Sequence, residues 1–443
     1  MSIFADGFTT DPYWWDAAPP EAAPTGPLPE TTDVAIIGSG FCGLAAALEL
    51  ARNGVRVDVL EAGPLGIGAS SRSGGMVSSG QKLVLKGALD SFTPEKATEA
   101  LEDSRATFEF LQTLIGREQL DADLQICGRF FGAYTPAHFT TLQRHAELLQ
   151  SKTGVQARIL SRAEQQAEIG SDFYHGGMLV EEYGGLHPSK YNRALRSAAR
   201  GAGAHMHNFA RVESWTSENG GVTVQTARGV VRAKHLMVAT NGYTAKELPW
   251  FQRRVVPVTA FIMATEPLAP GVMDAILPKR RMVSDTRREL SFYRPSPDHT
   301  RILFGGRPTA FVNDEREAAV GLRARMVQVW PQLADVKVSH AWRGNVAMTF
   351  DQLPHLGQEQ GVHYALGCNG NGVALMSWMG HQTALRILGR QNRPSAFENR
   401  PFPSMPGYHN RAWFLPLVSA GYHFRDFLDR PAAFLQERSL RRA

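Results

Sequence analysis

The sequence predicts an α/β protein of two domains: a doubly wound, Rossmann-like nucleotide-binding domain and a second domain built on an antiparallel sheet. Two observations predict this class. A strand, a glycine-rich turn and a helix follow one another within residues 33–61. Residues 253–344 instead hold short strand patterns at 254–265, 282–284, 290–294 and 301–305, separated by turn signals, as in an antiparallel meander. With 443 residues, the chain is long enough to bury two cores.

Composition narrows the class of protein further. Hydrophobic residues make up 43% of the chain and charged residues 20%, which is typical of a soluble globular protein. The net charge of +5 is too small to predict a nucleic-acid partner. No apolar run approaches the ~20 residues of a membrane span, and no signal peptide is evident. Cys42, Cys127 and Cys368 lack metal or redox spacing, so we expect a cytoplasmic protein.

Residues 33–61 have the layout of a dinucleotide-binding βαβ unit. An apolar strand pattern at 34–37 is followed by Gly38, Ser39, Gly40, Phe41, Cys42 and Gly43. Gly38 permits the tight turn, Gly40 lets a pyrophosphate approach the backbone, and Gly43 lets the helix pack closely. The next residues, 41–52, predict a helix whose free N–H groups face the phosphates. Glu61 ends the second strand, where its carboxylate can bind a ribose.

The loop after Glu61 is rich in glycine and serine and carries one arginine. Backbone N–H groups and a guanidinium suit a long ligand with phosphates and rings. The predicted contact residues of this loop are Ala62, Gly68, Ala69, Ser70, Arg72, Ser73, Gly74, Gly75 and Met76. The glycine fingerprint by itself does not separate NAD from FAD.

Later stretches continue the alternation of strands and helices. Residues 187–191 open a helix with proline in its first turn, and residues 218–221 predict a hairpin turn between strands at 212–215 and 222–224. A buried strand pattern at 236–242 ends in small residues. Residues 363–373 predict a strand, a glycine turn and a helix through about residue 388, whose N-terminus would favour negative charge on a bound ligand.

These motifs, together with Pro12-Tyr13-Trp14-Trp15 and the C-terminal glycine block, resemble the D-amino-acid oxidase superfamily of FAD-dependent amine and amino-acid oxidoreductases. The resemblance covers nearly the whole chain and is greatest to the gamma-glutamylputrescine oxidoreductase branch. It implies FAD as the cofactor. It also implies further cofactor contacts at Val212, Thr240, Asn241, Gly242, Gly344, Asp351, Gly367, Gly370, Asn371, Gly372 and Val373.

We expect each domain to be assembled from separated segments. The FAD-binding domain would comprise residues 32–85, 178–252 and 345–400, and the substrate-binding domain residues 86–177 and 253–344. Residues 1–31 would form an N-terminal extension, in which the aromatic segment at 12–15 packs on the body. Residues 401–443 would pack on the body as a C-terminal segment, either covering the core or contacting a partner.

The resemblance implies oxidation of the C–N bond of a small polar amine to an imine, which hydrolyses to an aldehyde or ketone. Electrons would pass to O2 or another acceptor. The candidate catalytic residues are Tyr293, Arg307 and Trp342. Because strand residues alternate faces, only one of Tyr293 and Arg294 should point inward, and we expect Tyr293 to do so.

Departures from the family pattern narrow the substrate and the mode of flavin binding. Val346 stands where glycine- and D-amino-acid-oxidising members place a carboxylate-clamping arginine, which disfavours a simple α-amino acid. Gly344 stands where monomeric sarcosine-type members attach flavin through a cysteine, and residues 76–81 contain no histidine. We therefore expect non-covalent FAD.

Other functions stay open at this point. One alternative is an oxidase or dehydrogenase of secondary amino acids such as L-pipecolate, sarcosine or another N-methyl amino acid. A flavin relay linked to NAD(P) would need a second glycine fingerprint, and a non-catalytic flavin-binding module would show no turnover. We expect no metal site, because His355, His363 and His381 lack ligand spacing. The oligomeric state is open.

Overall fold

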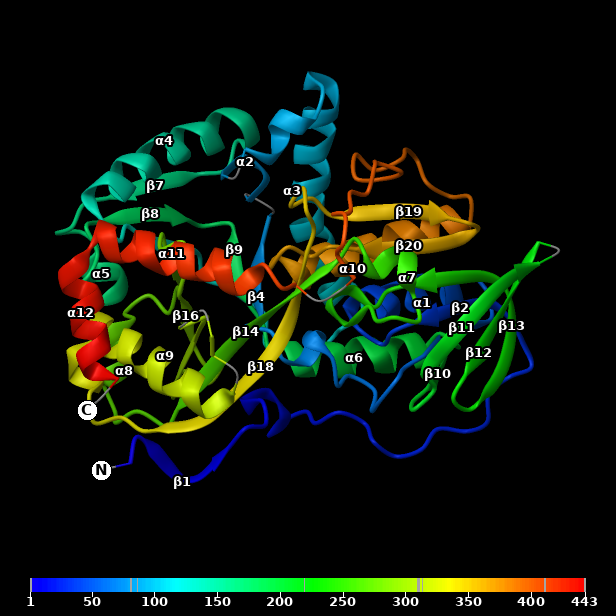
Figure 1. The fold of residues 1–443 in the computed structure, drawn as a ribbon, viewed down its shortest axis with the longest axis horizontal. Coiled ribbons are helices and arrows are strands. Elements are labelled where there is room, and N and C mark those ends of the chain that lie inside the picture. Colours follow the sequence, from blue (N-terminus) through cyan, green and yellow to red (C-terminus); the bar gives the residue numbers. More distant parts are fainter. Residues whose placement is uncertain are drawn as a thin grey trace.

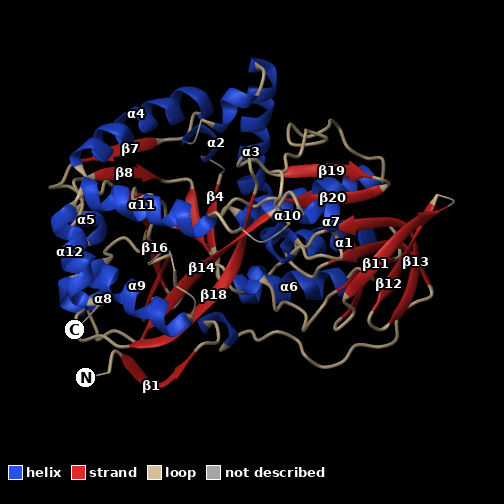
Figure 2. Cartoon of the chain, viewed as in Figure 1, coloured by secondary structure: helices blue, strands red, loops and turns tan. Residues whose placement is uncertain are grey.

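The computed structural model describes residues 2–79, 82–85, 87–218, 220–308, 311–312, 314–409 and 412–441. Two large sheets lie beside each other, and helices cover their faces (Figures 1 and 2). Two long strands, β14 (Val256–Thr265) and β18 (Val338–Met348), run near the middle of the molecule, where the two halves meet. This arrangement confirms the predicted α/β class with two sheets of different type.

The first sheet has the strand order β10-β3-β2-β13-β12-β11, with β20 and then β19 beside β13. Its parallel strands are β2 (Thr31–Ile37), β3 (Val57–Leu60), β10 (His205–His207), β13 (Gly229–Val238) and β20 (Val362–Leu366). Antiparallel pairs add β12 (Gly221–Thr226), β11 (Val212–Glu218) and β19 (His355–Glu359). The predicted hairpin between β11 and β12 is confirmed, although Asn219 in its turn lies outside the described residues.

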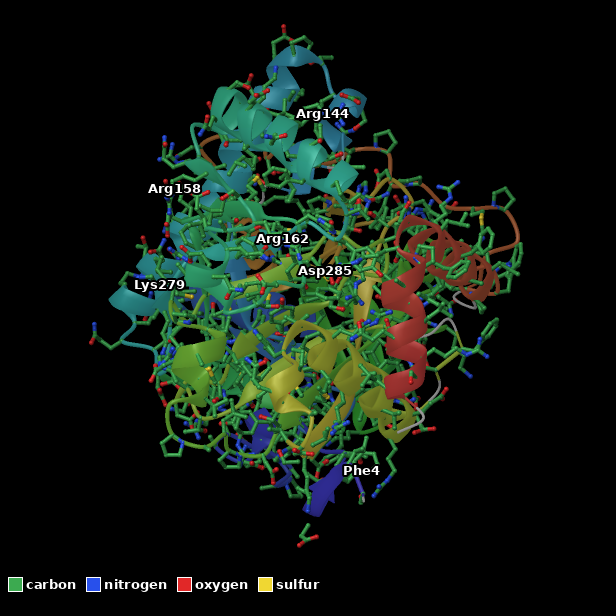
Figure 3. All side chains as sticks on the ribbon, turned by 90° about the vertical axis from the view of Figure 1, so that its left-hand side faces the viewer. Phe4, Arg144, Arg158, Arg162, Lys279 and Asp285 are labelled. Atoms are coloured by element: carbon green, nitrogen blue, oxygen red, sulfur yellow. The ribbon has the colours of Figure 1, made fainter. Side chains whose placement is uncertain are left out.

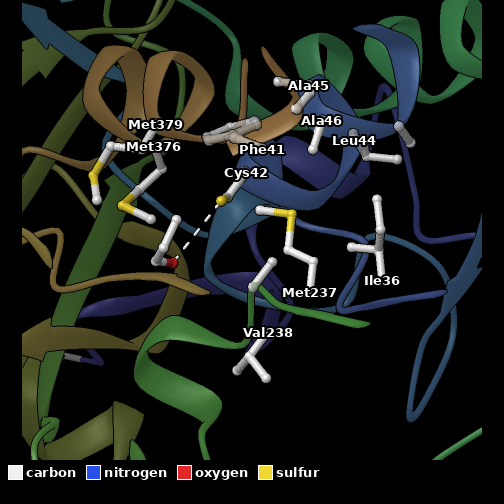
Figure 4. Packing of buried hydrophobic residues seen from close by; sticks show 14 of the residues in the cluster. Ile36, Phe41, Cys42, Leu44, Ala45, Ala46, Met237, Val238, Met376 and Met379 are labelled. Atoms are coloured by element: carbon white, nitrogen blue, oxygen red, sulfur yellow. Dashed lines mark hydrogen bonds between the residues drawn. The ribbon is translucent and has the colours of Figure 1, made fainter. Parts of the chain in front are cut away.

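Helices cover this half of the molecule, and one of them, Pro94–Arg117, packs here although residues 86–177 were predicted for the substrate-binding domain. They are α1 (Phe41–Arg52), α3 (Pro94–Arg117), α6 (Pro188–Gly201), α7 (Pro249–Gln252) and α10 (Gly372–Ile387). The bounds of α1 match the predicted helix, and α10 follows β20 across a glycine turn as expected. α1 is buried along nearly its whole length because β2 packs on one side and α10 on another. Figure 4 shows Phe41 and Cys42 of α1 beside Met376 and Met379 of α10.

The second sheet has the order β1-β18-β14-β17-β16-β15-β6-β8-β7. Besides β14 and β18 it contains β1 (Phe4–Thr9), β6 (Arg129–Gly132), β7 (Ala157–Leu160), β8 (Gly177–Val180), β15 (Met282–Asp285), β16 (Phe292–Pro295) and β17 (Ile302–Gly306). The sheet is mostly antiparallel, as predicted, but β1–β18 and β15–β6 are parallel. β15 and β6 come from segments far apart in the chain. Because no tight turn joins them, they are not constrained to run antiparallel.

One face of the second sheet is covered by α5 (Gln166–Ile169), α8 (Val272–Ile276) and α9 (Glu315–Val329), which enclose an apolar core. α4 (Pro136–Thr153) and α2 (Lys82–Leu85) cover its outer end, near β7 and β8. A small sheet of β4 (Met76–Ser78), β9 (Tyr183–Gly185) and β5 (Gln125–Ile126) lies beside the junction of the two halves.

The chain termini both add to the second half of the molecule. Trp14 is fully buried and its indole N–H donates to the carbonyl of Ser73 at 2.8 Å, so the prediction that the aromatic segment packs on the body is confirmed. β1, which the sequence did not signal, extends the sheet beyond β18. At the other end, α11 (Leu415–Asp429) crosses the front of the molecule and α12 (Pro431–Leu440) packs on α9 (Figure 1). Among the described residues, no helix is both long and apolar enough to cross a membrane.

Candidate active site

The glycine turn between β2 and α1 is shaped so that only glycine fits at two of its positions. Gly38 has φ +107°, and a Cβ there would lie 3.1 Å from the carbonyl oxygen of Ala239. A Cβ on Gly43 would lie 2.1 Å from the carbonyl oxygen of Gly38. The first intrahelical bond of α1 is Leu44 N–H to Gly40 O, at 3.0 Å. The N–H groups of Gly38, Ser39 and Phe41 donate to Leu60, Glu61 and Ser70. An anionic ligand would therefore meet the N–H groups of Gly40, Cys42 and Gly43 at the start of α1.

Glu61 is held against this turn. One of its carboxylate oxygens accepts hydrogen bonds from the Ser39 N–H at 2.9 Å and the Ser39 hydroxyl at 2.7 Å. The other accepts from the Ala62 N–H at 2.8 Å. These bonds fix the carboxylate at the edge of a cavity of about 330 Å³. Predicted cofactor residues that line this smaller cavity are Gly38, Ser39, Gly40, Glu61, Ala62, Gly68, Ala69, Ser70, Val212, Thr240, Asn241 and Gly242.

A larger cavity of about 820 Å³ adjoins the smaller one, because both are lined by Gly40, Ala69, Ser70 and Asn241. Further predicted cofactor residues line only the larger cavity: Phe41, Cys42, Arg72, Ser73, Gly74, Gly75, Met76, Gly344, Gly370, Asn371, Gly372 and Val373. The two cavities together form an elongated site that follows the glycine turn and reaches the N-terminus of α10. Such a shape fits a dinucleotide whose phosphates lie at the turn.

Polar contacts hold the walls of this site in place. The Arg72 guanidinium lies over the Trp15 ring at 4.5 Å and donates to the carbonyl of Ile67 at 2.8 Å. Ser78 and Asn371 share a hydrogen bond of 2.5 Å at the start of α10. Burial raises the pKa of the Cys42 thiol, so this residue is a neutral filler and not a nucleophile.

Three predicted cofactor residues line neither cavity. Gly43, in the first turn of α1, packs against the carbonyl of Gly38. Gly367 lies in the turn before α10, where its N–H donates to the Asn241 side chain at 3.0 Å. Asp351 is bound to His355 at 3.0 Å. Burial acts to raise the pKa of Asp351, but the hydrogen bond and charge of His355 together with hydrogen bonds from Leu353 and Thr349 outweigh burial, so the pKa lies below its ordinary value. These residues support the walls and do not form the surface of the site.

Of the predicted catalytic residues, only Arg307 lines the larger cavity. Tyr293 lies on the opposite face of the second sheet, stacked on Phe304 with its hydroxyl donating to the Tyr174 hydroxyl at 3.0 Å. This placement corrects the expectation that Tyr293 points inward, and the reason is strand alternation, because its neighbour Phe292 takes the cavity face. Trp342 is buried beside the 62–76 loop, where its indole N–H donates to the carbonyl of Arg72 at 2.7 Å.

Arg294 is buried as well, although it does not line either cavity. Its guanidinium donates to the carbonyls of Leu186, Gly74 and Gly75 at 2.8, 3.3 and 3.4 Å. It therefore fastens the loop that carries the predicted cofactor contacts to the second sheet.

Sequence reasoning missed part of the lining. The additional residues come from several elements and include Arg129, Tyr183, Arg288, Glu289, Phe292, Phe414, Ser419 and Tyr422. No local motif marks them, because they meet only when β6, β9, the loop before β16 and α11 come together. The Ser419 hydroxyl donates to Glu289 at 2.5 Å, which closes α11 onto the cavity. Burial raises the pKa of Glu289 above its ordinary value.

The lining is unbalanced in charge. Among its described residues, Arg72, Arg129, Arg288 and Arg307 are basic, and Glu289 alone is acidic. The charge of Arg288 is neutralised by ion pairs with Asp426, at 3.1 Å, and with Asp429. The cavity can therefore accept a ligand that carries negative charge in addition to any dinucleotide phosphates.

Comparison with known proteins places this site in a family. Residues 33–386 match the family model described as FAD dependent oxidoreductase. The chain is 32% identical to a probable oxidoreductase, OrdL, of Haemophilus influenzae, over 90% of this chain and 93% of that protein. It is 29% identical to gamma-glutamylputrescine oxidoreductase of Escherichia coli, over the same shares of the two chains.

Solved structures show the same fold. Glycine oxidase from Geobacillus kaustophilus superposes with a TM-score of 0.71 at 23% identity, covering 86% of this chain and all of that one. L-Amino acid deaminase from Proteus myxofaciens gives a TM-score of 0.70 at 16% identity, covering 88% of this chain and 97% of that one. The chain belongs to the family of FAD-dependent oxidoreductases, and FAD is its cofactor.

Proposed function

We propose that the protein oxidises the C–N bond of an amine within a small polar metabolite of the gamma-glutamylputrescine kind. The observation that carries the proposal is the elongated site, in which the glycine turn and the α10 N-terminus adjoin a separate space walled by the second sheet and α11. Similarity to gamma-glutamylputrescine oxidoreductase along 90% of the chain supports the same choice.

Bound FAD would supply the acceptor for a hydride equivalent from the carbon beside the neutral amine nitrogen. The resulting imine adds water and releases an aldehyde or ketone with ammonia or an amine, and the electrons pass on to O2 or another acceptor. The residues we propose to hold FAD are those that line the two cavities along the glycine turn, the 62–76 loop and the start of α10. We expect this binding to be non-covalent.

The chain's own side chains would position the substrate and exclude water. Val256, Val258, Ile262 and Phe292 give the sheet side of the cavity an apolar surface. Such a surface favours the neutral form of an amine over its ammonium form. Arg307, at the end of β17, is the predicted polar residue that reaches this space. Val346 also lines the larger cavity, so no guanidinium is present at that position to bind an α-carboxylate.

We further propose that the domain boundaries follow the segments predicted from sequence. The first sheet draws its strands from residues 31–60, 205–238 and 355–366, and the second sheet draws most of its strands from residues 129–160 and 256–348. The assignment departs from the predicted segments at three places. Residues 178–180 of β8 and residues 345–348 of β18 join the second sheet. α3, within the segment 86–177, packs on α10 of the first half.

A second candidate, an oxidase of secondary amino acids, is favoured by the excess of arginine in the lining. An anaerobic spectrum of the FAD-loaded protein separates the candidates when gamma-glutamylputrescine, putrescine, L-pipecolate, sarcosine and D-alanine are added in turn. We expect gamma-glutamylputrescine to bleach the visible flavin band. Bleaching by L-pipecolate or sarcosine alone would select the second candidate, and bleaching by none of them would favour a non-catalytic flavin-binding module. Admitting air then tests O2 as the acceptor.

A further inference from the structure

Arg129 is a cavity residue whose side chain is held in one orientation by the strands around it. It begins β6, and its Nε donates to the Ser284 hydroxyl of the neighbouring strand β15 at 3.1 Å. Its guanidinium lies over the Phe131 ring at 4.8 Å and over the Tyr183 ring at 5.2 Å. Stacking on two rings fixes the plane of the guanidinium while leaving its edge available for hydrogen bonds.

The charge of Arg129 has no carboxylate partner among the described residues. Burial lowers the pKa of its guanidinium, and the contributions that oppose burial come from the phenol of Tyr183 and not from an acid. The guanidinium still carries its charge at any physiological pH. Arg288 in the same lining differs, because it pairs with Asp426. A desolvated cation without a counter-ion is unfavourable, so its presence in a ligand cavity points to an anionic group on the ligand.

The position of Arg129 in the sheet separates it from the place where an α-carboxylate is clamped in other members of this fold family. Val346 occupies that place on β18, and β14, β17, β16 and β15 lie between β18 and β6. At ~4.8 Å per strand, five steps across the sheet amount to about 24 Å before twist is allowed for. An anion bound at Arg129 is therefore far from the β18 side of the cavity.

We propose that Arg129 binds a carboxylate of the substrate, and that this carboxylate lies many bonds away from the amine that is oxidised. The inference rests on the proposed function and deepens it, because it selects amines that carry a remote carboxylate over diamines and over simple α-amino acids. The guanidinium would donate two parallel hydrogen bonds to the carboxylate. Ser284, through its bond to Nε, would be a positioning residue for Arg129.

The test compares two substrates that share the same amine. γ-L-Glutamylputrescine carries a remote carboxylate, and N-acetylputrescine carries none. A charged hydrogen-bonded pair contributes about 1.5–3 kcal/mol, so Arg129→Gln should lower kcat/KM for γ-L-glutamylputrescine about 10- to 150-fold, mainly through KM. The value for N-acetylputrescine should change less than threefold. Arg129→Lys, which keeps the charge but loses the planar fork, should fall between wild type and Arg129→Gln.

Binding without turnover gives an independent readout. N-(γ-L-Glutamyl)butylamine has no terminal amine to oxidise, and its affinity for the FAD-loaded protein can be measured by calorimetry. Arg129→Gln should weaken its binding to the same extent as it lowers kcat/KM. Arg158→Gln is the matched control, because Arg158 lies on β7 of the same sheet with 61% of its side chain exposed, at the surface shown in Figure 3.

The outcomes distinguish the two proposals. Equal loss of activity toward both substrates would show that Arg129 is structural and would overturn the inference, as would a wild-type enzyme that prefers N-acetylputrescine. If Arg129→Gln does not fold, unchanged kinetics of Arg129→Lys on γ-L-glutamylputrescine would overturn it as well. If the wild-type protein oxidises neither amine but binds N-(γ-L-glutamyl)butylamine through Arg129, the proposed reaction fails while the carboxylate site stands.

Discussion

Replacing Gly43 by alanine tests the close approach of α1 to the glycine turn. The added Cβ would lie 2.1 Å from the carbonyl oxygen of Gly38 and 3.2 Å from the side chain of Ile36. Ordinary contact begins near 3.4 Å, so the first clash must be relieved by a backbone shift of about 1.3 Å. The helix cannot simply move away, because on its other side Gly380 of α10 packs against the Cys42 backbone, where a Cβ on Gly380 would lie 2.1 Å from the Cys42 carbonyl oxygen.

The cost follows from this geometry. Overpacking of a close-packed site costs about 1–3 kcal/mol when no flexible side chain can move aside. If that cost falls on the FAD-bound conformation, Gly43→Ala should weaken FAD binding about 5- to 150-fold, since 1.4 kcal/mol corresponds to a factor of ten. The melting temperature of the apoprotein should fall by less than that of the loaded protein.

The assay is a titration of flavin-stripped protein with FAD, followed by quenching of flavin fluorescence. Gly116→Ala is the control, because Gly116 is also helical, in α3, and nothing lies within 4 Å of its added Cβ. That change should leave FAD affinity unaltered and favour the helix slightly. An FAD affinity of Gly43→Ala within twofold of wild type would refute the close-packing argument.

Three further changes test other parts of the structure. Burial opposes ionisation of Glu437, but three arginines outweigh it and lower its pKa from 4.5 to about 2, so Glu437→Gln should cost about 3 kcal/mol in urea unfolding at neutral pH. That difference between wild type and variant should vanish as the pH falls from 4.5 through 2, and a pH-independent difference would contradict it. Tyr293→Phe should lower the free energy of unfolding by about 1 kcal/mol, because it removes the hydrogen bond to Tyr174, and should leave kcat/KM unchanged. A tenfold loss of kcat would show instead that Tyr293 acts in the active site. Arg294→Met should weaken FAD binding about tenfold or more in the same titration, because the carbonyls of Gly74 and Gly75 in the 62–76 loop and of Leu186 beside it lose their donor. Unchanged FAD affinity would show that the loop keeps its conformation without Arg294.

The cofactor half of the protein could be predicted from sequence because its physical requirements are local. The turn at Gly38 needs a positive φ, the packing of Gly43 excludes a Cβ, and Glu61 must end a strand next to that turn. Each requirement falls within about thirty residues and leaves a recognisable pattern. The predicted bounds of α1 are exact for the same reason, since apolar periodicity and the Asn53-Gly54 stop signal agree.

The substrate half could be predicted only as a class of sheet. The alternation of Phe292, Tyr293 and Arg294 was readable, but which face meets the cavity depends on the helices that cover the other face. β1 could not be predicted, because Phe4–Thr9 has no alternating apolar pattern. Its strand conformation depends on backbone pairing with β18, which is distant in the sequence. α11 was likewise readable as an apolar segment, but not as a wall of the cavity.

Substrate choice in this fold is therefore a question about charges that only the assembled structure brings together. The polar side of α11 faces inward, where Ser419 and Asp426 bind Glu289 and Arg288, so these two charges are already engaged by the helix that closes the cavity. Arg72 is engaged by backbone carbonyls of its own loop and its neighbour. Arg129 has no carboxylate partner among the described residues, and the rings and the hydroxyl that hold it do not neutralise its charge. A neutral or dicationic amine would leave the buried charge of Arg129 without a counter-ion, whereas an amine with a remote carboxylate would pair with it on binding. Because this pairing forms in the ground state as well as in the transition state, loss of the substrate carboxylate should raise KM more than it lowers kcat.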